Sequence, residues 1–100
     1  MRAYVLSPAA ERDLIVTLRA GIRNFGAAQA FVYQETLEQA FRTLAAFPQM
    51  ARERKRFRPA IRVHHHGRHY IVYRVREKDI RILRVLQDDA DLGRHLRRIR

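Results

Sequence analysis

Cysteine is absent from the 100-residue sequence, and no stretch approaches the roughly 20 apolar residues that a membrane-spanning helix needs. Disulfide bonds and thiolate zinc sites are therefore excluded. The N-terminus also lacks the cationic start and unbroken apolar segment of a signal peptide. We accordingly expect a soluble cytoplasmic protein without a membrane segment, and we predict no cofactor.

Acidic residues are scarce, because 10 Asp and Glu stand against 21 Lys and Arg, which gives a formal net charge of +11. Nineteen of these cations are Arg, whose guanidinium group pairs with phosphates and carboxylates and tolerates partial burial. The excess predicts a polyanionic target, an acidic protein partner, or both. A single domain of residues 1–100 buries only about two thirds of its unfolded surface, so a permanent partner would also add stability.

The N-terminal half predicts a strand followed by two helices. The apolar run at 3–6 indicates the strand, and Ser7 followed by proline is typical of a helix cap. Apolar residues recur at helical spacing over 8–24, Gly26 ends that helix, and a second apolar stripe runs over 27–47. The short turn between them predicts an antiparallel helix hairpin.

The C-terminal half predicts three strands. Ile61 begins an alternating segment, 70–75 is β-branched and aromatic, and 80–86 is apolar with interspersed Arg. Tight turns at 66–68 and 76–79 join these strands into an antiparallel meander, which the N-terminal strand can join. The predicted order is β-α-α-β-β-β, an α+β fold in which the N-terminal helix hairpin covers an antiparallel sheet.

Two segments lie outside these predicted strands and helices. Residues 49–59 form a predicted loop that is rich in Arg. After the last strand, aspartates within 88–91 offer caps for a short C-terminal helix, with Leu92, Leu96 and Ile99 on one side and arginines on the other.

The order of elements and a series of local motifs resemble the ParE branch of the RelE/ParE toxin superfamily over nearly the whole chain. In chain order the motifs are Leu6-Ser7-Pro8-Ala9-Ala10 with Asp13-Leu14, Phe25-Gly26, Leu44-Ala45-Ala46-Phe47-Pro48, Arg58-Pro59 with Ile61-Arg62, Gly67-Arg68-His69-Tyr70 with Tyr73-Arg74, and Ile82-Leu83-Arg84-Val85-Leu86. Their combination in this order carries the resemblance.

The resemblance implies the toxin of a type II toxin-antitoxin pair, neutralised by an acidic, co-transcribed antitoxin of the ParD type. ParE-like relatives are associated with inhibition of DNA gyrase, and RelE-like relatives with cleavage of mRNA on the ribosome. We predict a toxin that binds and poisons gyrase without catalysing a reaction, so we assign no catalytic residue. A ribosome-dependent mRNA endonuclease is the alternative, and a non-toxic antitoxin-binding module is the second alternative.

The segment after the last strand bears on this choice. Many relatives carry a His-Gly-Arg-Arg-Asp-like sequence there, whereas this chain has Gln87-Asp88-Asp89-Ala90-Asp91. Cleavage of RNA needs cations on the scissile phosphate and a side chain that transfers a proton. Three aspartates repel a phosphate, so this segment weighs against a ribonuclease.

The residues expected to contact the target are cations of the sheet and of the C-terminal surface. They are Arg62, Arg68, Arg74, Arg84, Arg94, Arg97 and Arg98. For Arg62 and Arg74, which lie within predicted strands, solvated strand faces are the simpler interpretation.

Arg84 poses a particular problem, because it shares the alternating face of Ile82 and Leu86. A cation on an apolar face needs a partner. Contact with a target is one interpretation, and an internal ion pair with Asp79 or Asp91 is the other.

The antitoxin is expected to contact a groove between the hairpin and the sheet edge, as a helix or an added strand, together with the basic loop. The candidate residues are Phe31, Arg52, Arg54, Arg56 and Arg58. This loop has no stacking aromatic beyond Phe57, so direct nucleic-acid binding is not favoured over a protein partner.

Histidines at 64–66 and 69 suggest a metal site, but the pattern argues against it. Strand alternation sends His64 and His66 to one face and His65 to the other, and no Cys or nearby carboxylate completes a tetrahedral set. We therefore predict no metal. Acid-base function in a nuclease, or charging at mildly acidic pH, are the remaining interpretations of these imidazoles.

Overall fold

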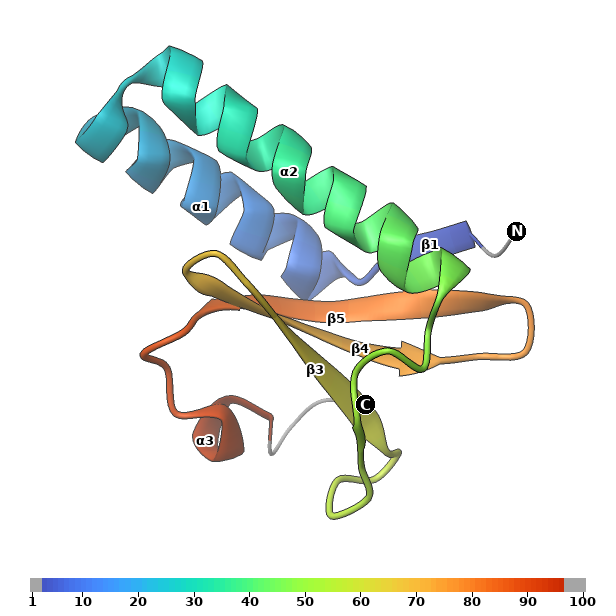
Figure 1. The fold of residues 1–100 in the computed structure, drawn as a ribbon. Helices are drawn as coiled ribbons and strands as arrows, with labels where there is room; N and C mark the ends of the chain where they lie inside the picture. Colours follow the sequence, from blue (N-terminus) through green and yellow to red (C-terminus); the bar gives the residue numbers. More distant parts are fainter. Residues whose placement is uncertain (1–2, 97–100) are drawn as a thin grey trace.

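The computed structural model describes residues 3–96 of the chain, and Figure 1 shows their arrangement. The elements follow in the order β1 (Ala3–Leu6), α1 (Pro8–Phe25), α2 (Ala27–Ala46), β2 (Glu53–Arg54), β3 (Ile61–His66), β4 (His69–Val75), β5 (Asp79–Gln87) and α3 (Leu92–Leu96).

The strands form one five-stranded sheet in the order β1-β5-β4-β3-β2. The neighbours are antiparallel except for β1, which pairs in parallel with β5. Figure 1 shows α1 and α2 packed as an antiparallel pair over one face of this sheet and α3 on the other face. The predicted α+β fold is confirmed. The two-residue strand β2 lies inside the predicted loop at 49–59.

Ser7 begins α1 and ties it to the sheet. Its hydroxyl accepts the backbone N–H of Ala10 at 3.0 Å, as an N-cap does, and donates to the carbonyl oxygen of Leu83 at 2.8 Å. Its own backbone N–H donates to the carbonyl oxygen of Ile82 at 2.9 Å. The start of the hairpin is therefore fixed to the middle of β5.

The main core lies between the hairpin and the sheet. The stripe of α2 is buried there through Leu37, Phe41 and Leu44, and the ring of Tyr4 from β1 lies 5.4 Å from that of Phe41. Tyr73 of β4 is buried in the same cluster and donates its hydroxyl to the carbonyl oxygen of Pro48 at 2.8 Å. Burial of each such side chain contributes about 1.5–3 kcal/mol, so this stripe dominates the packing.

A second apolar cluster covers the opposite face of the sheet. Its buried members are Ile61, Val72, Leu83, Leu86 and Leu96. Because Leu96 belongs to α3, this cluster is what holds the short C-terminal helix against the sheet.

The stripe predicted along α1 is only partly buried. Leu14 and Leu18 are half-buried, but Phe25, at the end of the helix, is 60% exposed. Figure 1 shows the reason, because the joined ends of α1 and α2 project beyond the sheet. The apolar positions in this projecting part have no sheet beneath them.

A β-bulge in β5 changes the face of its later residues. Val72 of β4 pairs with Arg84, but Tyr73 pairs with Ile82, so the register shifts between these pairs. Ile82 accordingly packs in the core beneath the helices, whereas Leu86 packs in the cluster on the opposite face. The prediction that Arg84 shares one face with Ile82 and Leu86 was wrong, because a bulge breaks the alternation.

Arg84 has an internal partner, and that partner is Asp13 of α1. The guanidinium donates to both carboxylate oxygens of Asp13, at 2.7 and 3.0 Å. The same carboxylate accepts the backbone N–H of Val85 at 2.9 Å. The hydrogen bond to Asp13 raises the pKa of Arg84. An ion pair was one of the two interpretations, but the predicted partners Asp79 and Asp91 were wrong.

Replacing Asp13 by Ala removes three hydrogen bonds and leaves the partly buried Arg84 without its counterion. We expect the free energy of unfolding to fall by about 2–3 kcal/mol. Urea unfolding followed by circular dichroism measures this change. Glu38→Ala, on the exposed surface of α2, is the matched control and should stay within about 0.5 kcal/mol of the unmodified chain. Equal unfolding midpoints for the two variants would contradict the assignment.

Candidate functional site

The cations predicted to contact the target do not form one cluster. Arg68 is exposed in the turn before β4, while Arg74 is half-buried near the other end of that strand, about 20 Å away by strand geometry. Arg94 is exposed on α3, where its backbone N–H donates to the Asp91 carboxylate at 3.2 Å. Arg97 and Arg98 lie outside the described residues.

Arg62 has internal contacts instead of the solvated face predicted for it. Its side chain is only 17% exposed and donates to the carbonyl oxygen of Ala51 at 2.6 Å. A guanidinium nitrogen also lies 3.7 Å from the carboxylate of Glu53 on the neighbouring strand. Arg62 therefore fixes the segment before β2 to the sheet.

The candidate antitoxin contacts occupy two separate regions. Arg52, Arg56 and Arg58 are exposed around the short strand β2, and Arg54 within it is half-buried. Phe31 lies in the first turns of α2 and is 53% exposed. Because this part of α2 projects from the far side of the molecule, Phe31 and the basic loop are not adjacent (Figure 1).

The helix hairpin carries six of the nine large apolar side chains that are exposed among the described residues. We call these six the hairpin apolar surface, and its residues are Ile15, Val16, Ile22, Phe25, Phe31 and Val32. Monomeric proteins rarely expose many large apolar side chains together unless a partner covers them. The sequence analysis named only Phe31 from this surface as a binding candidate. Ile15 and Val16 fall outside the helical stripe of α1, and this position in the pattern was a signal that they face solvent.

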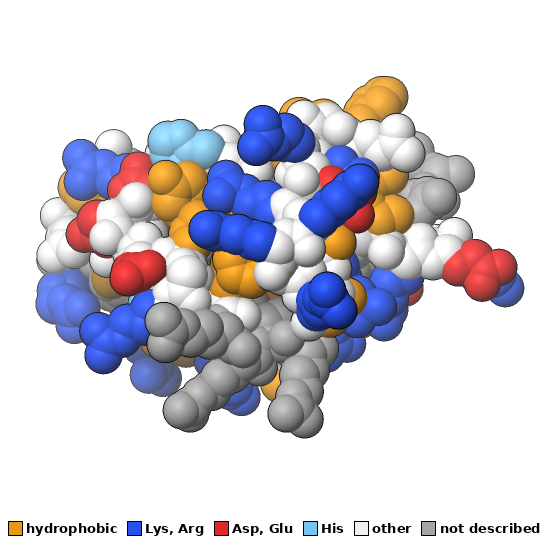
Figure 2. Space-filling view, turned by 90° about the horizontal axis from the view of Figure 1, so that it is seen from below, with side chains coloured by type: hydrophobic (Ala, Val, Ile, Leu, Met, Phe, Trp, Pro, Cys, Tyr) orange, Lys and Arg blue, Asp and Glu red, His pale blue; other side chains and the backbone are white. Residues whose placement is uncertain are grey.

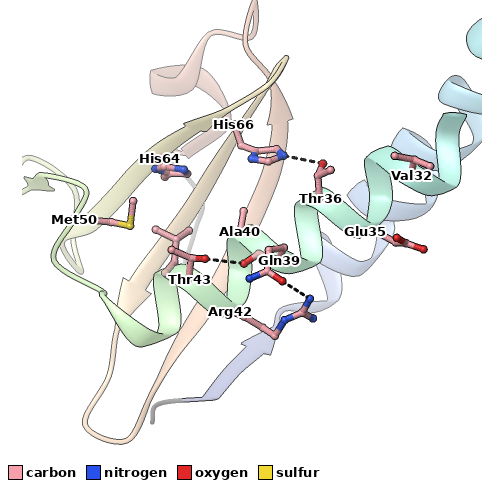
Figure 3. A pocket seen from close by; sticks show the side chains of 11 residues that line it. Val32, Glu35, Thr36, Gln39, Ala40, Arg42, Thr43, Met50, His64 and His66 are labelled. Atoms are coloured by element: carbon pink, nitrogen blue, oxygen red, sulfur yellow. Dashed lines mark hydrogen bonds between the residues drawn. The ribbon is translucent and has the colours of Figure 1, made fainter.

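An open groove runs between α2 and β3, with a cavity volume of about 580 Å³. Figure 3 shows His66 reaching from β3 to Thr36 on α2, where its Nε2 lies 3.0 Å from the hydroxyl oxygen. His64 and Met50 line the groove further along. The outer edge of β3 is paired to β2 only at Ile61 and Arg62, so among the described residues the rest of that edge faces the groove unpaired.

The histidines join α2 to the β3–β4 turn. The Tyr33 hydroxyl lies 2.7 Å from Nδ1 of the buried His69 and accepts the backbone N–H of Arg68 at 3.3 Å. A Cβ on Gly67 would lie 2.7 Å from this hydroxyl, and the φ of Gly67 is +56°, so both packing and backbone conformation require glycine. These contacts close the turn against the hairpin.

Burial determines how these groups titrate. It lowers the pKa of His69 and also that of His64 and His66, and it raises the pKa of Tyr33. Within residues 3–96, no group of three or more His, Asp or Glu side chains is placed to hold a metal ion.

The segment after β5 is engaged in the fold. The Asp88 carboxylate lies 3.1 Å from Nε2 of His65, and its backbone N–H donates to the carbonyl oxygen of Arg68. Asp91 accepts the backbone N–H of Arg94 near the start of α3. Asp88 and Asp91 thus organise the C-terminal turn.

The described helices include none with the combined length and apolar character needed to cross a membrane.

The fold of this chain is also found among solved structures. It is similar to a solved structure described as "Chromosomal ParDE TA system from P. aeruginosa", with a TM-score of 0.71. The match covers 87% of this chain and 96% of that chain, at 21% sequence identity. This likeness shows a shared fold.

Sequence comparison identifies the family. The family model described as "ParE toxin of type II toxin-antitoxin system, parDE" matches residues 4–92. The chain is 35% identical over 94 residues to Toxin ParE1 of Mycobacterium tuberculosis, covering 93% of this chain and 96% of that protein. It is 31% identical over 84 residues to Toxin ParE3 of Caulobacter vibrioides, covering 84% of each. The chain belongs to the ParE toxin family, as its motifs predicted.

The lowered pKa of His69 predicts how stability depends on pH. Below its ordinary pKa of 6.5 the unfolded chain binds more protons than the folded chain, so the free energy of unfolding should fall as pH decreases from about 6.5. One such group contributes at most about 1.4 kcal/mol per pH unit. Urea midpoints measured between about pH 7.5 and 5 test this sign.

His69→Gln should make that pH dependence shallower, because it removes the most buried of the three imidazoles. His95→Gln, at an exposed position of α3, serves as the control and should keep the slope of the unmodified chain. If the free energy of unfolding depends on pH equally with and without His69→Gln, His69 does not contribute to that dependence.

Proposed function

We propose that this chain is a cytoplasmic toxin that inhibits growth by binding DNA gyrase, and that an acidic antitoxin of the ParD type neutralises it. Membership of the ParE family supports the toxin role. The hairpin apolar surface is the observation that carries the proposal, because the exposed Ile15, Phe25 and Phe31 offer a partner large apolar side chains to cover.

The positions of potential acid-base groups support binding over RNA cleavage. His69 is buried against Tyr33, and Asp88 is paired with His65. A ribonuclease needs a proton-transferring side chain beside cations that hold the scissile phosphate. Arg68 lies beside the exposed His65–Asp88 pair, whose carboxylate would repel a scissile phosphate.

The antitoxin is proposed to dock as an amphipathic helix on the hairpin apolar surface. An amphipathic helix binds by laying its apolar face on exposed apolar side chains such as these. Binding to the folded state also stabilises the toxin by mass action. The exposed cations Arg52, Arg56 and Arg58 lie apart from this surface and are proposed to contact an acidic segment of the same antitoxin.

The target is proposed to meet the sheet side and the C-terminal surface of the toxin. Arg68, Arg74 and Arg94 are the described candidates, and Arg97 and Arg98 extend the proposal beyond the described residues. Arg62 and Arg84 are left out of this proposal because both have internal contacts.

Induction of the chain without antitoxin distinguishes the mechanisms. The proposal predicts growth arrest with an SOS response and altered plasmid supercoiling while translation continues. Translation arrest with discrete mRNA cleavage, detected by primer extension on translating ribosomes, would support the endonuclease instead. Unimpaired growth, with the protein shown by immunoblot to accumulate, would support an antitoxin-binding module that is not toxic.

Co-expression of the antitoxin in the same cells tests the docking surface. Growth should be restored with the unmodified toxin and restored less with Phe31→Ala, because truncation of an apolar anchor costs about 2 kcal/mol of binding. Phe47→Ala is the matched control, since Phe47 is 66% exposed at the other end of α2. Equal rescue of the two variants would place the antitoxin elsewhere.

A further inference from the structure

Two arginines lie directly opposite each other on the sheet face that α1 and α2 do not cover. Arg74 of β4 and Arg81 of β5 are register partners. Tyr73 and Ile80, their neighbours along the strands, pack in the core beneath the helices. Strand alternation therefore places both arginines on the opposite face. Sequence reasoning had singled out Arg74 but not Arg81.

This pairing is electrostatically unfavourable within the protein. Like charges directly opposite each other across antiparallel strands destabilise a sheet. Neither guanidinium has a hydrogen bond or ion pair with another residue in 3–96, although both are half-buried. The carboxylates of Asp13 and Asp79 are engaged by other arginines. A counterion from outside the described chain would relieve this repulsion.

The cationic face continues across the strands. In the antiparallel pairing of β3 with β4, Arg62 lies opposite Tyr73. Ile61, one residue before Arg62, therefore lies opposite Arg74. Ile61 also lines a cavity of about 450 Å³ together with Arg56 and Arg58. Adjacent strands are about 4.8 Å apart, so the line that crosses from Arg81 on β5 to Ile61 on β3 is about 10 Å long. Arg56 and Arg58 lie at its β3 end.

Figure 2 views this face and shows Lys and Arg side chains across its middle, between apolar patches. A line of guanidinium groups with this spacing suits an extended polyanion better than a single carboxylate.

The aromatic rings on this face are already in contact with other side chains. The guanidinium carbon of Arg56 lies 4.8 Å from the centre of the Phe57 ring, and the imidazole of His65 lies 5.2 Å from the ring of Tyr70. Single-stranded nucleic acids are held largely by bases that stack on open aromatic rings. With these rings occupied, contact with backbone phosphates is favoured over contact with bases.

We propose that the line formed by Arg81, Arg74, Arg56 and Arg58 binds the phosphate backbone of duplex DNA without reading its sequence. The toxin would then contact DNA directly, in addition to any protein target. Because Arg56 and Arg58 are also proposed antitoxin contacts, a bound antitoxin would compete with DNA for them. This inference does not rest on the gyrase proposal, because a chain that binds duplex DNA keeps this site whether or not it binds gyrase.

Fluorescence anisotropy of the full chain with a short labelled DNA duplex of arbitrary sequence tests the site. Binding should weaken steeply as salt rises from about 50 to 200 mM. Arg74→Gln with Arg81→Gln should raise the Kd about tenfold and reduce the slope of log K against log salt by about 2. Removal of the repulsion should leave the urea midpoint of this variant equal to or above that of the unmodified chain.

The matched control is Arg12→Gln with Arg19→Gln, which removes the same charge from exposed positions of α1. It should change the Kd less than about twofold. Equal weakening by the two double variants would overturn the proposal, because bulk charge would then explain the binding. If the Gln variant unfolds, Arg74→Lys with Arg81→Lys keeps the charge but loses bidentate pairing, and it should still weaken binding.

Competing ligands test the choice of duplex DNA. Single-stranded DNA and duplex RNA of equal length should compete less well than duplex DNA. Poly-glutamate at equal charge concentration should also compete poorly. Strong competition by poly-glutamate would assign the line to an acidic protein, and stronger binding of RNA or of the single strand would assign it to another nucleic acid. Absence of duplex binding by the unmodified chain at low salt would overturn the proposal outright.

Discussion

The carboxylate of Asp13 couples the helix hairpin to the sheet. It accepts two hydrogen bonds from Arg84 and one from the backbone of Val85, just after the bulge in β5. Ser7, six residues earlier, is bonded to the same strand through its hydroxyl and its backbone N–H. These contacts set where α1 starts and leave its far end beyond the sheet. The exposure of Ile22, Phe25 and Phe31 near that end is thus a consequence of how the helix is anchored.

Local chemistry in the sequence was sufficient for the elements and their order. The Ser7 cap, the buried stripe of α2 and the two tight turns each depend on residues close in the chain. The partner of Arg84 could not be found this way, because Asp13 lies 71 positions away and the bulge breaks the alternation used to place side chains. The parallel pairing of β1 and the two-residue β2 likewise depend on contacts with distant strands.

The candidate binding surfaces were predicted less completely than the fold. Charge identified Arg74, but its opposition to Arg81 depends on strand register, which composition does not encode. Conversely, Arg62 was expected to be solvated and instead bonds the carbonyl oxygen of Ala51. The result is a molecule with two different outward faces, an apolar one on the hairpin and a cationic one on the sheet. The proposed antitoxin contacts fall on both faces, because Phe31 belongs to the hairpin and Arg56 and Arg58 belong to the cationic face.

The central claim is that the toxin acts by binding and not by turnover. Titration of the purified chain into a DNA supercoiling reaction with a known concentration of gyrase tests it most directly. The account predicts that inhibition saturates near one toxin per gyrase site, and that adding antitoxin restores supercoiling in proportion. Full supercoiling activity at a large excess of toxin, together with mRNA cleavage on ribosomes at substoichiometric toxin, would contradict it.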